Sequence, residues 1–224
     1  MQENACKVCK MINIEDQESL FKLIADYLEK DITCIAIGGA AMMFHGYKTA
    51  TKDIDLVFNN AADRGVFIKA IKSLGYSQKS MKLIYDEKMH QAKDKPLIYS
   101  RGEERFDLFV KSVFGIEVSF ESIMQRHDYI GKKELIILTL SKELIILLKS
   151  ATSRERDYED IETIAKIEKN IGWNFIISEA IRIKKDNPWI LLDLEEKMRK
   201  LSKIIFFKKE LFERIYGAEN KYKK

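Results

Sequence analysis

Proline and cysteine are both scarce in this chain of 224 residues, which contains two prolines and three cysteines. So few prolines, together with 46% hydrophobic and 33% charged residues, exclude a disordered chain and indicate a folded one. Three cysteines are too few, and odd in number, for a disulfide framework. They fit a reducing compartment, so we expect a cytoplasmic protein.

Long hydrophobic runs are also missing. No stretch approaches eighteen uncharged apolar residues, so we expect no transmembrane helix and no membrane partner. Lys7 and Lys10 are followed by no apolar core, so we expect no secretory signal. Cys6 and Cys9 have the spacing of half a zinc site without a second pair. An inert N-terminus is favoured over a redox pair or a zinc site shared by two chains.

A strong excess of one charge is absent as well, since the net charge is +4. Residues 1–140 contain 20 basic and 20 acidic side chains, whereas residues 141–224 contain 19 and 15. The whole excess therefore lies in the C-terminal part. It would suit a partner that carries phosphates, although a solvated helical surface has the same composition.

The pattern of the sequence changes near residue 140. Short β-branched runs alternate with helical stretches before it, and helical spacing continues almost to the end after it. This predicts an α+β domain over residues 1–140 and a helical domain over residues 141–224. The predicted strands span 32–37, 54–58, 82–85, 97–100, 105–110 and 135–138. The predicted helices span 15–30, 40–45, 61–74, 158–169, 173–184 and 189–216, with a further helix capped by Ser141.

Two glycines and two acids in a fixed order carry the most information. A predicted strand ends at Gly38-Gly39, and a second one opens with Asp53-Ile54-Asp55. Adjacent glycines let the backbone approach a phosphate, and a following helix N-terminus points free N–H groups at it. Asp53 and Asp55 would face the same side of a strand, where they repel unless a cation lies between them. Mg²⁺ is the expected ion, because it prefers carboxylate and phosphate oxygens.

Asp107 is the best candidate for a third carboxylate. It lies inside the otherwise apolar strand predicted at 105–110, where an unpaired charge would be costly. A metal partner would explain its position. The alternative is a salt bridge to a neighbour such as Lys52 or Arg105.

In this order the residues resemble the DNA polymerase beta-like nucleotidyltransferase superfamily. The resemblance rests on Ile37-Gly38-Gly39 and on the run Gly-Tyr-Lys-Thr-Ala-Thr-Lys-Asp-Ile-Asp-Leu at 46–56. The chain is most similar to the small prokaryotic branch that includes the abortive-infection toxin nucleotidyltransferases. The similarity continues at 141–149 and 154–161, and so covers roughly residues 33–165 in pieces.

This resemblance implies a nucleotidyltransferase-type mixed sheet with flanking helices, followed by a C-terminal helical domain. Residues 1–140 would then be the catalytic domain. The implied catalytic and metal-binding residues are Asp53, Asp55 and Asp107. The implied nucleotide-binding residues are Gly38, Gly39, Lys48, Thr51, Lys149 and Asp157. The branch often has an arginine where Lys48 stands, and lysine neutralises a phosphate without binding it bidentately.

Several of these side chains have a second interpretation. Lys149 lies at the edge of an apolar stripe and could extend along it to solvent. Asp157 and Asp160 could cap a helix or form salt bridges within the charged run 154–160. We expect His45 to pack or to cap a helix rather than to act as a base. A helical core is favoured over a base-stacking platform for Trp173, Phe175, Trp189, Phe206 and Phe207.

The implied reaction transfers a nucleoside monophosphate from a nucleoside triphosphate, such as ATP, to an acceptor hydroxyl with the help of two Mg²⁺ ions. The basic C-terminal part favours RNA or tRNA as the acceptor, in a toxin-like protein that could have an antitoxin partner. One alternative is the same chemistry on a small molecule such as an aminoglycoside. Another is a regulatory module that binds nucleotide without turnover, which has no physical need for three clustered acids.

Overall fold

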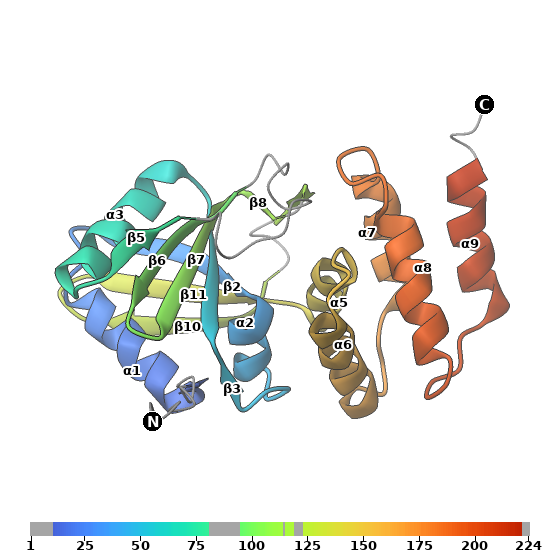
Figure 1. Ribbon diagram of the computed structural model, residues 1–224, viewed down its shortest axis with the longest axis horizontal. Coiled ribbons are helices and arrows are strands. Elements are labelled where there is room, and N and C mark those ends of the chain that lie inside the picture. Colours follow the sequence, from blue (N-terminus) through green and yellow to red (C-terminus); the bar gives the residue numbers. More distant parts are fainter. Residues whose placement is uncertain (1–10, 81–94, 114, 119–122, 221–224) are drawn as a thin grey trace, which may run out of the picture.

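The computed structural model describes residues 11–80, 95–113, 115–118 and 123–220. The predicted strand at 82–85 and the Cys6/Cys9 pair lie outside these residues. A sheet with helices on both faces forms one half of the molecule, and the helices from α5 onward form the other (Figure 1). This is the α+β architecture with a C-terminal helical part that the sequence predicts.

The central sheet has seven strands in the order β10-β11-β2-β4-β7-β6-β5. It is mixed, because β11 pairs with β2 and β4 pairs with β7 in parallel, while the other neighbours are antiparallel. In spatial order, the strands are Ile123–Ile130, Glu134–Leu140, Ile32–Ile37, Asp53–Phe58, Glu104–Val110, Leu97–Arg101 and Ser77–Lys79. Two short pairs lie outside it: β1 (Ile12–Asn13) with β3 (Ala50–Thr51), and β8 (Ser112–Val113) with β9 (Ile116–Glu117).

The interior strand β2 is apolar on both sides, because helices cover both faces of the sheet. Cys34 and Ala36 face the cluster that contains α1 (Ile14–Ala25) and α3 (Ala61–Ser73). Ile35 and Ile37 face the cluster that contains α2 (Gly38–Phe44) and α5 (Lys142–Ser150). Alternating residues of a strand point to opposite faces, so a strand buried on both faces carries a continuous apolar run.

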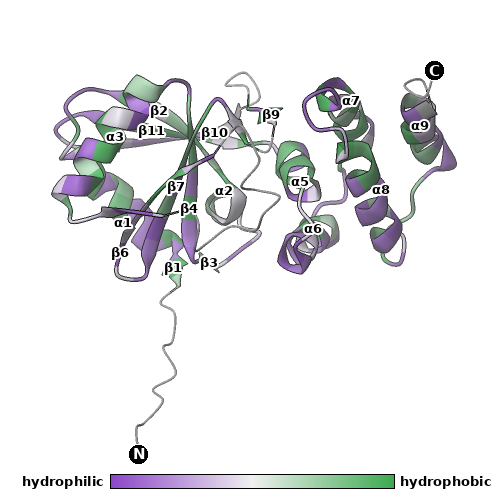
Figure 2. Ribbon diagram, turned by 45° about the horizontal axis from the view of Figure 1, so that its top comes forward, coloured by the Kyte–Doolittle hydropathy of each residue, from purple (hydrophilic) through white to green (hydrophobic). Residues whose placement is uncertain are grey.

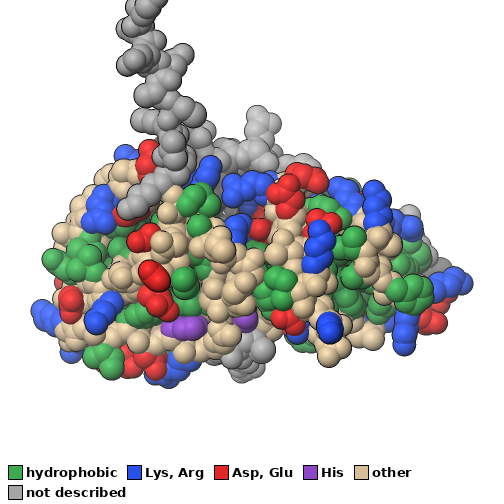
Figure 3. Space-filling view, turned by 90° about the horizontal axis from the view of Figure 1, so that it is seen from below, with side chains coloured by type: hydrophobic (Ala, Val, Ile, Leu, Met, Phe, Trp, Pro, Cys, Tyr) green, Lys and Arg blue, Asp and Glu red, His purple; other side chains and the backbone are tan. Residues whose placement is uncertain are grey.

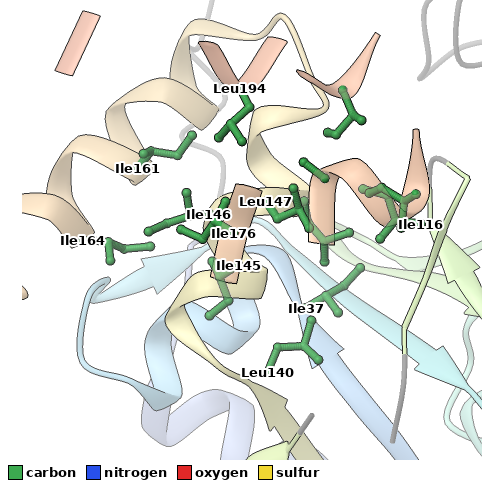
Figure 4. Packing of buried hydrophobic residues seen from close by; sticks show 14 of the residues in the cluster. Ile37, Ile116, Leu140, Ile145, Ile146, Leu147, Ile161, Ile164, Ile176 and Leu194 are labelled. Atoms are coloured by element: carbon green, nitrogen blue, oxygen red, sulfur yellow. The ribbon is translucent and has the colours of Figure 1, made fainter. Parts of the chain in front are cut away.

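One hydrophobic cluster joins the sheet to the C-terminal helices. It runs from Ile37 and Leu140 through α5 to Ile161 and Leu194 in the C-terminal helices (Figure 4). The helical part turns its apolar faces inward toward this cluster (Figure 2). Its helices are α6 (Glu155–Ile167), α7 (Trp173–Ile183), α8 (Ile190–Leu201) and α9 (Lys209–Asn220). The cluster therefore crosses the predicted boundary at residue 140.

Some predicted helices are wrong in length. The single helix predicted at 189–216 is two helices, α8 and α9, separated by residues 202–208. Four apolar residues in a row at 204–207 would spread around every side of a continuous helix, although only one side can be buried. The first helix ends at Ala25 rather than at residue 30. Strands β5 and β10 were not predicted, because neither has an apolar alternation.

The C-terminal aromatic residues divide into two groups. Phe207 is buried and Trp173 packs edge-on against it, with ring centroids 4.8 Å apart, so the core prediction is confirmed for these two. It is wrong for Phe175, Trp189 and Phe206, whose exposed fractions are 44%, 68% and 90%. Exposed hydrophobic side chains are intermixed with charged ones on the face in Figure 3. Among the described residues, no helix combines the length and the apolar character needed to cross a membrane.

Two adjacent leucines of α8 test the shared core. Leu191 is fully buried in the cluster, whereas Leu192 is 42% exposed. We expect Leu191→Ala to lower the free energy of unfolding by about 2–5 kcal/mol, because it leaves a cavity among packed side chains. Leu192→Ala should change it by less than about 1 kcal/mol. Urea denaturation followed by circular dichroism measures both, and equal losses would contradict the packing described here.

Candidate active site

The three predicted carboxylates lie on two neighbouring strands. Asp53 and Asp55 belong to β4, and Asp107 belongs to β7. The parallel register places Asp55 opposite Asp107 and Asp53 opposite Arg105. Residues two apart share a face of the sheet, so the three carboxyl groups and the Arg105 side chain lie together. All four line one cavity between the sheet and helices α5 and α6.

Arg105 is the side chain that holds two of these acids. Its guanidinium donates to Asp53 Oδ2 over 2.6 Å and to Asp107 Oδ2 over 3.2 Å, and its Nε lies 2.9 Å from Asp107 Oδ1. Asp107 is completely buried. The salt bridge considered for Asp107 as an alternative is therefore present, with Arg105 as the partner. The sequence analysis did not predict that Arg105 also binds Asp53.

The third acid, Asp55, is in a different electrostatic state. Burial, followed by the charges of Asp107 and Asp53, raises the pKa of Asp55 to about 8, against the opposing effects of Arg105 and Lys149. One guanidinium thus does not compensate three buried or half-buried carboxyl groups. At neutral pH the site retains a proton where a metal cation could instead lie.

The glycine turn fits closely against these acids. Gly38 has a φ of +57°, and a Cβ there would overlap Asp55 Oδ2. A Cβ at Gly39 would overlap Thr51 Oγ1, which donates a hydrogen bond to the Asp53 carbonyl over 3.1 Å. Both positions therefore require glycine in order for the turn to approach β4. The short helix begins at Gly38 itself, not at residue 40 as predicted.

The opposite wall of the cavity is a buried ionic network. Lys149 Nζ lies 3.0 Å from Asp157 Oδ1 and 2.6 Å from Asp160 Oδ2. Asp160 also binds Lys48 over 2.9 Å, and Asp157 binds Arg154 over 2.7 Å. Lys149 does not extend to solvent, because it is only 7% exposed. Asp160 was considered beside Asp157, with a helix cap or a salt bridge within the run 154–160 as the alternative. Its partners are instead Lys48 and Lys149, which it connects.

The network determines the protonation of Asp157. Burial alone would raise the pKa of this carboxyl, but Lys149, the Thr152 hydroxyl and Arg154 together hold its pKa below the usual value. Asp157 is therefore an anion at neutral pH that neutralises its basic neighbours. The buried charges of Lys149 and Asp157 on this wall are thus paired at neutral pH.

The predicted nucleotide-binding residues lie in this cavity, whereas His45 lies outside it. Gly38, Gly39, Lys48, Thr51, Lys149 and Asp157 all line the same cavity as the three acids. His45 does not line it: its Nε2 lies 2.7 Å from the Leu140 carbonyl oxygen and its ring stacks on Tyr47, so it has the predicted packing role. Arg105, Arg154, Arg156 and Asp160 line the cavity without having been predicted.

The carboxyl groups are not arranged around a preformed metal position. In the described ranges, no three side chains of histidine, cysteine, aspartate or glutamate lie grouped to hold an ion. Asp53 and Asp107 are turned toward the Arg105 guanidinium instead. The donor set nevertheless suits a hard divalent cation, because it offers carboxylate oxygens in excess of the positive charge beside them.

Sequence comparison identifies the class of protein to which this site belongs: the chain is a nucleotidyltransferase. The chain belongs to the family described as "Nucleotidyltransferase of unknown function (DUF6036)", whose profile matches residues 15–211. The match covers both the sheet with its glycine turn and most of the C-terminal helices. Among curated proteins, none matches the chain.

Two solved structures show distant likeness. JHP933 from Helicobacter pylori is 13% identical, with 93% of this chain and 91% of that chain covered and a TM-score of 0.43. ANT(2")-Ia, in complex with adenylyl-2"-tobramycin, is 15% identical, with 75% of this chain and 97% of that chain covered and a TM-score of 0.46. The family match, rather than this likeness, identifies the chain.

The raised pKa of Asp55 makes stability depend on pH. An unfolded aspartate loses its proton near pH 4, whereas folded Asp55 keeps it to about pH 8. The native state therefore binds the extra proton, and its stability falls as pH rises between these values, by at most about 1.4 kcal/mol per pH unit.

We expect Asp55→Asn to match the native protein in stability below about pH 4 and to exceed it by a margin that grows up to about pH 8, since the amide cannot ionise beside Asp53 and Asp107. Urea denaturation in the presence of a chelator, at several pH values, measures this difference. The exposed Glu159→Gln on α6 is the control and should leave the pH dependence of the native protein unchanged. A constant difference between Asp55→Asn and the native protein would contradict the assignment.

Proposed function

We propose that this nucleotidyltransferase uses Mg²⁺, bound by Asp53, Asp55 and Asp107, to transfer a nucleoside monophosphate from a nucleoside triphosphate to an acceptor hydroxyl. The observation that carries the proposal is the juxtaposition of three carboxyl groups on adjacent strands with a glycine turn. Among the described residues that line the sheet side of the cavity, Arg105 is the basic side chain that faces these acids.

To bind Mg²⁺, the three acids would exchange part of their contact with the Arg105 guanidinium, and the proton on Asp55, for the metal ions. Asp53 and Asp107 give up part of their pairing with Arg105, and Asp55 releases its proton. When bound, two Mg²⁺ ions would neutralise charge on the attacking and leaving oxygens of the reaction. Asp107 either accepts the proton of the acceptor hydroxyl or serves as a ligand to the ion that lowers the pKa of this hydroxyl.

The remaining cavity residues would position the nucleotide. Gly38 and Gly39 allow the triphosphate to approach the backbone without a side chain in the way. Thr51 holds this turn against β4 through its hydrogen bond to the Asp53 carbonyl. Lys48 and Lys149, fixed by Asp160, place positive charge on the opposite side of the cavity.

For the acceptor we propose an RNA strand. A second cavity is lined by Lys169, Trp173 and Phe206, at the other end of α6 from the first. Phe206 is 90% exposed, and Lys203 and Lys208 beside it in the loop are exposed as well. Aromatic rings next to cations bind single-stranded nucleic acid by stacking and by phosphate contact. The thirteen residues of α6 span about 20 Å, and the two cavities lie toward its opposite ends.

A cationic small molecule such as an aminoglycoside finds less support. It would need carboxylates free to bind its ammonium groups. In the described part of the cavity wall, Asp157 and Asp160 are both engaged by basic side chains of the protein itself. An RNA acceptor needs no such groups, so the electrostatics favour it.

Removal of a carboxylate tests the reaction. We expect Asp53→Asn and Asp107→Asn each to lower transfer of label from a nucleoside triphosphate by at least about 100-fold, since each acts on the reacting charge. Mg²⁺ and labelled nucleoside triphosphates are incubated with total RNA, and incorporation is measured. The control is Asp128→Asn on β10, which lies outside the cavity. Full transfer by either active-site variant would overturn the proposal.

Removal of the exposed ring tests the acceptor. We expect Phe206→Ala to lower transfer to RNA by about tenfold or more, since one stacked base contributes about 1–3 kcal/mol. Binding of the nucleoside triphosphate should be unchanged. Trp189→Ala, which removes another exposed aromatic residue that does not line the second cavity, is the matched control. Equal transfer by the two variants would argue against this RNA site.

A further inference from the structure

The basic side chains that line the cavity differ in whether a carboxylate already engages them. Four are engaged, and their partners are given above: Lys48, Arg105, Lys149 and Arg154. The fifth is Arg156, in the first turn of α6. Arg156 is exposed, and within the part of the chain that the structure describes its side chain has no ion pair or hydrogen bond.

The two sides of the cavity carry opposite formal charge. On the sheet side, three carboxyl groups face one guanidinium, which leaves −2 when all three are ionised and −1 with the proton that Asp55 keeps at neutral pH. On the other side, Asp157 and Asp160 face four basic groups, from Lys48, Lys149, Arg154 and Arg156, which leaves +2. A ligand that fits this field is positive where it contacts the sheet and negative where it contacts the helices.

A nucleoside triphosphate with its metal ions has this distribution. The ions lie toward the acids, and the phosphates that point away from them carry the negative charge. Lys149 cannot turn toward these phosphates freely, because it is buried and binds two carboxylates. Arg156 can bind them without breaking any ion pair that the structure shows, and its planar guanidinium suits two oxygens of one phosphate.

We infer that Arg156, which nothing in the sequence analysis assigned to the site, binds the β- and γ-phosphates of the substrate and the pyrophosphate that leaves. This inference rests on the proposed function. In that reaction the acceptor oxygen bonds to the α-phosphorus, and the bond from that phosphorus to the α–β bridging oxygen breaks. The bonding electrons stay on pyrophosphate, whose added negative charge Arg156 stabilises, while the acceptor proton passes to a base.

Binding measurements with matched ligands test this role. The probes are the four nucleoside triphosphates, the monophosphate of whichever binds best, and inorganic tripolyphosphate, each with Mg²⁺ in a calorimetric titration. We expect Arg156→Met to weaken the triphosphate and tripolyphosphate by about 10- to 100-fold, as for a charged hydrogen bond, and the monophosphate by less than about twofold. Arg156→Lys should lie between, because it keeps the charge and loses the bidentate geometry.

The control is Lys166→Met, near the other end of the same helix and outside the cavity, which should leave all three affinities unchanged. Native affinity of Arg156→Met for the triphosphate would overturn the inference and leave the proposed function intact. An equal loss for monophosphate and triphosphate would also overturn it, as would a loss confined to RNA binding. Failure of the native protein to bind any nucleoside triphosphate or tripolyphosphate would overturn the proposed function and this inference together.

Discussion

The contact between the Arg105 guanidinium and the acids of two adjacent strands is the constraint on which the site depends. The strands must be apolar to be buried between helices, yet each carries a carboxyl group at the same level of the sheet. The acids cannot move apart without a shift of strand register, and such a shift would expose the core. The repulsion between the three acids is reduced in two ways. Arg105 binds two of them, and the raised pKa of Asp55 keeps the third protonated at neutral pH. The cavity wall opposite obeys the same rule, since its buried charges are paired through Asp157 and Asp160.

Much of the half that contains the sheet could be predicted because local signals and tertiary needs agree there. The run Ile32–Ile37 is β-branched and forms an interior strand of the sheet, so its pattern and its burial coincide. The spacing of Asp53 and Asp55, two residues apart on a strand, is enough to predict that they lie on the same face of the sheet. The sequence predicts that Gly38 and Gly39 let a phosphate approach the backbone. The structure adds a second reason for glycine, since the side chains of Asp55 on β4 and Thr51 on β3 occupy the space that a Cβ would need.

What could not be predicted depends on which side chains meet in space. Arg105 looks like an ordinary charge two residues before Asp107, and only the pairing of β4 with β7 brings it to Asp53. Asp160 looks like part of a solvated charge run until Lys48, more than a hundred residues earlier, is seen beside it. Phe206 and Phe207 are identical neighbours in the sequence, but the loop between α8 and α9 buries one and exposes the other. No periodicity distinguishes them, because the loop has none.

The hydrophobic cluster that runs from the sheet into the C-terminal helices has a consequence for how such a chain can change over time. A nucleotidyltransferase whose two halves were joined by a linker could exchange its helical half as a unit. Here Leu140, Ile161 and Leu194 belong to one packed cluster, so a foreign helical half would have to reproduce a complementary apolar surface. The loop at 202–208 is under no such restriction at its exposed positions, Lys203, Phe206 and Lys208. Under the acceptor site proposed above, new acceptors would therefore be acquired most readily by substitutions in this loop, while the residues of the first cavity stay as they are.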